Sequence, residues 1–131
     1  MAHYDIFIAQ PFHGKTEEEI LRERDRIEDA LHKLFPDDEL NFLSGYTSDE
    51  PVYTDETRNR IYNLGRSISL MSTADYVFFP DMDAGVLGCM IEEYVTHLYD
   101  IPTIKECPAN WTDHDESESF KYIIERRVII R

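Results

Sequence analysis

The sequence has few of the residues that mark several protein classes. It contains only two cysteines, Cys89 and Cys107, which form no C-x-x-C pair and are too few for a disulfide scaffold, so we interpret them as free thiols in a reducing compartment. Basic residues are also scarce, 13 against 27 acidic ones, and the formal net charge is −14. Because such a surface repels phosphate backbones and no run of Lys and Arg interrupts it, we expect no nucleic-acid partner.

Long apolar stretches are absent as well. The first apolar run, Ile6 to Ala9, is only as long as a strand, and no stretch approaches the length that crosses a bilayer. We therefore expect a cytoplasmic protein with no membrane partner. The 131 residues, 42% apolar and 31% charged, are typical of one globular domain, expected to cover residues 1–131.

Apolar runs of strand length alternate with segments of helical periodicity. One helix is expected to begin at a capping box of Thr16 and Glu19 and to end before Pro36. A second carries Ile61, Leu64, Ile68 and Met71 on one face, and a third lies in the stretch 85–100, which is expected to open as a loop and continue as a helix. The expected strands are Tyr4–Ala9, Leu40–Leu43, Tyr76–Phe79 and Ile101–Ile104. This order predicts an α/β fold with a doubly wound parallel sheet of four to five strands, whose ligand sites lie in the loops after the strands.

The remainder of the sequence is less regular. Glu106 to Ser119 is rich in acidic and turn residues and is expected to be an exposed loop. Asp115 and Glu118 are placed to cap a last helix, and Val128 to Ile130 fits either a final strand or a docking tail. That last helix is expected to face the sheet through Phe120, Ile123 and Ile124.

Glu92 is a candidate nucleophile in the predicted βαβ unit. We expect it in the first turns of the helix, where free N–H groups and the helix dipole favour a negative charge and keep the carboxylate ionised near neutral pH. An ionised carboxylate at the mouth of an open α/β sheet can act as a nucleophile. The alternative is an ordinary helix glutamate, because the neighbouring Glu93 carries the same charge.

The loop after the first strand, residues 9–16, fits a permissive Walker A pattern with Ala9 at the first glycine position. A phosphate-binding nest needs successive N–H groups, whereas Pro11 removes one donor and Phe12 adds bulk. A weaker hypothesis is that the side chains of His13 and Lys15 and the nearby amides hold a single phosphate.

No metal or cofactor is expected. Four residues that are common metal ligands have a spacing that matches no ligand arrangement: Asp81, Asp83, His97 and His114. Three aromatic residues lie in predicted loops, where they either stack on a flat ring or seal the edge of the core: Phe12, Tyr46 and Tyr53.

Four segments, taken in order and spacing, resemble the nucleoside 2-deoxyribosyltransferase-like family, and within it a branch of small bacterial and phage proteins of unassigned function. The resemblance extends from about Tyr4 to Ile104. It is carried by the segments Ile8–Phe12, Gly65–Ser67, Ala74–Phe79 and Gly88–Glu92.

The resemblance implies a flavodoxin-like fold, a homo-oligomer, and cleavage of the N-glycosidic bond of a deoxynucleoside or its 5′-monophosphate. It gives the nucleophile's role to Glu92, places Gln10 and Phe12 in the base or sugar pocket, and lets the backbone at Gly88 approach the ligand. The sequence departs from the family where transferases carry an aspartate, because Val86 stands there. Asp83 replaces that aspartate only if the loop is rearranged.

Three hypotheses follow. The first is an N-glycosidic-bond enzyme with Glu92 as nucleophile and with His13, Lys15 and Arg66 near an anionic group, a hydrolase being favoured slightly over a base-exchange transferase because of Val86. The second is a non-catalytic protein that binds or sequesters a nucleotide. The third is a P-loop phosphotransferase, in which Asp81 would hold the metal.

Overall fold

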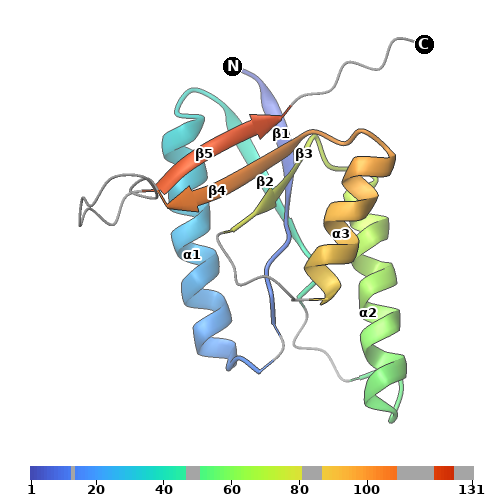
Figure 1. Ribbon diagram of the computed structural model, residues 1–131. Coiled ribbons are helices and arrows are strands. Elements are labelled where there is room, and N and C mark those ends of the chain that lie inside the picture. Colours follow the sequence, from blue (N-terminus) through green and yellow to red (C-terminus); the bar gives the residue numbers. More distant parts are fainter. Residues whose placement is uncertain (13, 47–50, 81–86, 109–119, 126–131) are drawn as a thin grey trace.

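The computed structural model describes residues 1–12, 14–46, 51–80, 87–108 and 120–125 of the 131 (Figure 1). Strands and helices alternate along most of this part of the chain, as the sequence predicts. In order, the elements are β1 (His3–Ile8), α1 (Glu17–Leu34), β2 (Glu39–Ser44), α2 (Glu56–Met71), β3 (Tyr76–Phe79), α3 (Leu87–Leu98), β4 (Thr103–Pro108) and β5 (Phe120–Glu125).

The strands form one sheet in the order β2-β1-β3-β4-β5. The first four are mutually parallel, and β5 lies antiparallel to β4. Helix α1 covers one face of the sheet, while α2 and α3 lie together on the other (Figure 1). This arrangement is the predicted doubly wound α/β fold of the flavodoxin-like type.

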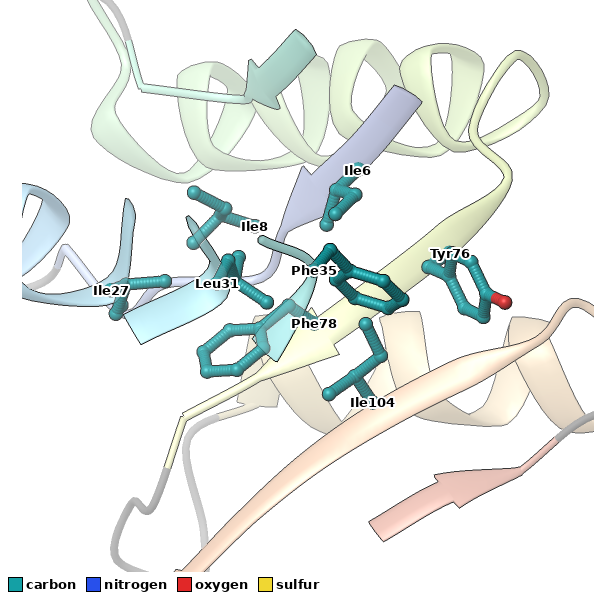
Figure 2. Close-up of a cluster of buried hydrophobic side chains, with 8 residues drawn as sticks. All are labelled: Ile6, Ile8, Ile27, Leu31, Phe35, Tyr76, Phe78 and Ile104. Atoms are coloured by element: carbon teal, nitrogen blue, oxygen red, sulfur yellow. The ribbon is translucent and has the colours of Figure 1, made fainter. Parts of the chain in front are cut away.

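Two apolar cores lie on the two faces of the sheet. Ile6 and Ile8 of β1 point toward α1, and Phe7 and Ala9 point toward α2 and α3, because successive side chains of a strand alternate between faces. All four residues of β3 are buried, as expected for a central parallel strand. Figure 2 shows the core on the α1 face, where strand side chains meet three residues from α1 and its end, namely Ile27, Leu31 and Phe35.

The boundaries of α1 follow from local signals in the sequence. The hydroxyl of Thr16 accepts a hydrogen bond from the N–H of Glu19, and the Glu19 carboxylate accepts one from the N–H of Thr16, which confirms the predicted capping box. The helix ends at Leu34, before Pro36, as predicted. Helix α2 begins earlier than its apolar pattern indicates, because Asp55 caps it by accepting from the N–H of Arg58 at 3.1 Å.

The prediction of a last helix is wrong. Phe120–Glu125 is strand β5, paired with β4 so that Tyr122 lies opposite Glu106 and Ile124 opposite Ile104. An apolar stretch this short fits the periodicity of a helix and that of a strand equally well. It forms a strand here because the edge of β4 is available for pairing. Asp115, Glu118 and residues 128–130 lie outside the described residues.

The prediction that Glu106 begins an exposed loop is wrong. Residues 106–108 extend β4, and the side chain of Glu106 is completely buried. Both of its carboxylate oxygens accept hydrogen bonds from Arg26 of α1, at 3.0 and 2.9 Å, and the Tyr122 hydroxyl donates to Oε2 at 3.2 Å. A buried charge requires such partners, and here they join α1, β4 and β5.

One glycine makes a close packing contact. A Cβ atom at Gly45, just after β2, would lie against the hydroxyl of Ser67 on α2, so no larger residue fits there without a shift. Gly65, within α2, has open space beside it. Within the described ranges, no helix has both the length and the apolar character needed to cross a membrane.

Candidate functional site

The candidate site lies at the carboxyl ends of β1 and β3. The chain leaves β1 for α1 on one face of the sheet and leaves β3 for α3 on the other, so the connections diverge at this point. The N–H of Ala9 donates to the carbonyl of Phe78 at 2.9 Å, which holds the two strand ends together. In open α/β sheets, ligands bind in the crevice that such diverging connections leave.

Glu92 is buried at this end of α3. Glu92 is 7% exposed, and its carboxylate oxygen Oε2 has no hydrogen-bond partner within the described part of the chain. Burial raises the pKa of Glu92 to about 7, because desolvation disfavours the charged form. A buried carboxyl group with an unpartnered oxygen is the feature expected of a site that a ligand completes.

The predicted full ionisation of Glu92 is wrong. Helix α3 begins at Leu87, which places Glu92 in the second turn and leaves the first turn without an acidic residue. The favourable effect of free N–H groups is confined to the first turn, so burial dominates. Glu92 is therefore about half protonated near pH 7.

Cys89 lies one turn before Glu92 and fixes α3 to the end of β1. Its thiol donates to the carbonyl of Ala9 at a sulfur–oxygen distance of 3.5 Å. Burial, together with the nearby charge of Glu92, raises the pKa of Cys89 to about 12, so the thiol is protonated and is not a nucleophile. The positive charge of Lys15 has the opposite effect on this pKa, which places Lys15 within electrostatic reach of the site.

Gln10 approaches the same end of the sheet from the α1 face. Its amide Nε2 donates to the carbonyl of Ile20 at 2.8 Å, and only the nitrogen of the amide is able to donate there. The oxygen Oε1 is consequently the free atom, and it is buried without a hydrogen-bond donor among the described residues. Gln10 and Glu92 thus bring two unsatisfied buried acceptors to the ends of β1 and α3.

Two of the three loop aromatics contact each other rather than lying apart. The rings of Phe12 and Tyr46 have centroids 5.2 Å apart, which joins the loops after β1 and β2. Tyr46 also has a raised pKa, first because it is partly desolvated and then because of the charge of Glu17. Tyr53 packs against Tyr62 of α2 instead, with ring centroids 6.0 Å apart.

Comparison with known proteins bears on the fold alone. No family model matches the sequence, and a search of curated proteins gives no match either. Among solved structures, the chain is similar to a conserved protein from Enterococcus faecalis V583, with 16% sequence identity and a TM-score of 0.50. The likeness covers 87% of this chain and 70% of that one. At this level of identity, it supports the flavodoxin-like arrangement and carries no information on activity.

Two amides of the loop of residues 9–16 are already hydrogen-bonded and are therefore not available to a phosphate. The N–H of Ala9 is bonded to Phe78, and the N–H of Lys15 donates to the carbonyl of Phe12 at 3.1 Å. Pro11 has no N–H to offer. Gly14 adopts φ +78°, which forms the turn that exposes Lys15. The exposed side chain of Lys15 is an anion-binding group within electrostatic reach of Cys89.

The structure places the remaining predicted site residues as follows. Arg66 is half-buried on α2, and no described contact brings it to Glu92. Gly88 is in the first turn of α3, and His13 and Asp83 lie outside the described residues. No group of three or more potential metal ligands occurs in the described part, a search that does not reach Asp81, Asp83 or His114.

The sequence analysis assigned Cys89 no role in the site. The pattern that could have identified Cys89 is its separation of three residues from Glu92, which puts both residues on one face of a helix. A small hollow elsewhere, lined by Glu93, His97, Thr103 and Lys105 among others, belongs to a different region. Residues of α3 and β4 line this hollow, and Glu92, Gln10 and Cys89 are not among them.

Proposed function

We propose that the protein cleaves the N-glycosidic bond of a nucleoside or nucleoside 5′-monophosphate, with Glu92 as the nucleophile. The observation that carries the proposal is the buried Glu92 carboxyl group at the strand ends, whose Oε2 has no hydrogen-bond partner among the residues that the structure describes. The order of residues along the chain, which resembles the nucleoside 2-deoxyribosyltransferase-like family from Ile8 to Glu92, supports the same assignment.

The chemistry is that of a retaining glycosidase. Ionised Glu92 stabilises positive charge that develops at the anomeric carbon and then bonds to that carbon, while the base leaves with the electron pair of the C–N bond. Water next attacks the glycosyl ester and regenerates the carboxylate. Because Glu92 has a pKa of about 7, its reactive form is present at neutral pH and is poorly hydrated, which favours attack. The reaction requires neither a metal nor a cofactor.

The loops after β1 and β2 carry groups that we assign to the rest of such a substrate. Gln10 offers a fixed acceptor for a hydroxyl or amine, and the Phe12–Tyr46 pair offers an aromatic wall for a base. Lys15, with His13 and Arg66, is assigned to an anionic group such as a 5′-phosphate. Val86, at the family's aspartate position, favours hydrolysis over base exchange. We place this activity in the cytoplasm, consistent with two free cysteines.

The test is release of free base from a panel of deoxynucleosides and their 5′-monophosphates. Glu92→Gln removes the nucleophile and keeps the shape of the side chain, so we expect turnover to fall about a thousandfold or more while substrate binding persists. The matched control is Glu93→Gln, which changes the next residue and disturbs only the ion pair of Glu93 with Lys105. Equal loss in both variants would remove the basis for assigning Glu92.

A non-catalytic nucleotide-binding protein is the second candidate. The two unsatisfied acceptors, Gln10 Oε1 and Glu92 Oε2, favour a ligand that donates hydrogen bonds, and donation alone requires no bond cleavage. Thermal stabilisation by a nucleotide that is recovered intact after long incubation would support this candidate over the enzyme. A P-loop phosphotransferase is disfavoured because the amides of Ala9 and Lys15 are already hydrogen-bonded.

A further inference from the structure

Strand β5 forms an open edge of the sheet. It is the last strand in the order, and within the described residues no strand pairs with its outer side (Figure 1). Two of its aliphatic side chains are unusually accessible, Ile123 at 46% and Ile124 at 38% exposure. Natural edges are commonly protected by proline, a bulge, short length or charged side chains, because unpaired backbone groups recruit another strand. The stretch Phe120–Glu125 contains no proline, and its pairing with β4 is continuous.

We propose that β5 pairs with β5 of a second copy of this chain, in antiparallel orientation about a two-fold axis at Ile123. An isologous contact of this kind requires that the strand complement itself when reversed. The sequence Phe-Lys-Tyr-Ile-Ile-Glu does so, because reversal about Ile123 sets position 121, a lysine, opposite position 125, a glutamate. It also sets Tyr122 opposite Ile124 and Ile123 opposite itself. The inference does not depend on the proposed catalytic function.

Charge complementarity favours a second copy as the occupant of this edge. Two copies with a formal net charge of −14 each repel, so they meet best through a segment whose own charges balance. The six residues of β5 contain one lysine and one glutamate. Glu125 is exposed at the end of β5, so its carboxylate is accessible to a cation across the axis. Opposite charges that face each other across an antiparallel pair are stabilising, and like charges are destabilising.

A competing surface lies on α3. Met90, Tyr94 and Leu98 follow one another at intervals of four residues and are 54%, 62% and 58% exposed. This stripe is uncharged, but it offers neither unpaired backbone groups nor a charge pattern that specifies an occupant. It therefore supplies the matched control for the test.

The first experiment measures the mass of the full-length protein by sedimentation equilibrium over a concentration series. We expect a monomer–dimer equilibrium for the wild type and a monomer for Ile123→Lys, because the two-fold axis then brings two ammonium groups together. Tyr94→Lys, an equivalent change on α3, should leave the equilibrium unchanged. A monomeric wild type, or a dimer that only Tyr94→Lys dissociates, would overturn the proposal.

The second experiment is a charge swap across the proposed axis. Lys121→Glu and Glu125→Lys each convert two attractive pairs into two repulsive ones, so each should raise the dimer Kd about tenfold. The double variant restores opposite charges and should return Kd to within about threefold of the wild type. If the double variant is instead weaker than either single one, the pairing register is wrong. Circular dichroism of every variant separates dissociation from unfolding, and base release, assayed separately, reports on the catalytic proposal.

Discussion

Two adjacent carboxyl groups on α3 have opposite surroundings. Glu93 is partly exposed and accepts a hydrogen bond from Lys105 at 2.7 Å, whereas Glu92 is buried with one oxygen unpartnered. Their difference arises from position on the helix, since consecutive residues point about 100° apart and only one of them faces the end of the sheet. The chemical distinction between two identical residue types is thus created by the fold.

Burial of Glu92 makes stability depend on pH in a defined direction. Its pKa is raised from an ordinary 4.5 to about 7, so the folded state holds a proton that the unfolded state has already lost between these values. Stability therefore falls as pH rises from about 4.5 to about 7, and the full penalty above that range is about 3 kcal/mol. We expect Glu92→Gln to be more stable than the wild type at pH 8, with the difference vanishing near pH 4.

Urea unfolding at a series of pH values measures this effect, with Glu93→Gln as the control for loss of a neighbouring, partly exposed carboxyl group. A pH-independent difference between Glu92→Gln and the wild type would mean that the carboxyl group is well solvated. If Glu92 is the nucleophile, kcat/KM rises as pH increases through about 7, where the charged form appears. Activity then increases over the same range in which stability falls.

At the scale of elements, local signals predicted most of the fold. The capping box of Thr16 and Glu19 and the stop before Pro36 define α1 from neighbouring residues alone, and the apolar run Tyr76–Phe79 identifies the central strand. The prediction failed at Phe120–Glu125, since six residues fit a helix or a strand and pairing with β4 decides. At the candidate site, Glu92 was predicted from its place after the third strand and from the family resemblance, but its protonation depends on burial, which no local pattern reports.

Glu106 illustrates the same limit, because its partner Arg26 is 80 residues away in the sequence. The ion pair is bidentate, the Glu106 side chain is fully buried, and hydrogen bonds from Arg26 to Glu23 and Glu106 raise the pKa of the guanidinium. Removing one member of a buried pair leaves the other charge without compensation. We expect Arg26→Met to lower the free energy of unfolding by about 3 kcal/mol.

Two further variants test whether burial of the ion pair causes the loss of stability. Arg22→Met breaks an ion pair of similar length, 2.8 Å to Glu18, but both of its side chains are exposed, so we expect a change below about 1 kcal/mol. Adding Glu106→Gln to Arg26→Met removes the stranded charge and should recover part of the loss. Equal effects of Arg22→Met and Arg26→Met in urea unfolding would show that burial of Glu106 gives the pair no special weight.

At the scale of the whole molecule, the dominant property is the excess of acidic residues. The formal net charge is −14 on 131 residues, with a pI of about 4.6. The acidic side chains repel one another more strongly in the compact folded state than in the expanded unfolded chain. Sodium chloride should therefore raise the thermal unfolding midpoint at pH 7.5. Most of the rise is expected below about 0.1 M, where the Debye length falls to about 10 Å. Potassium chloride should act equally, because screening depends on ionic strength rather than on the ion. A midpoint that instead climbs steadily toward molar salt would indicate salting-out of apolar surface, and would remove self-repulsion as the main electrostatic term in the stability of this fold.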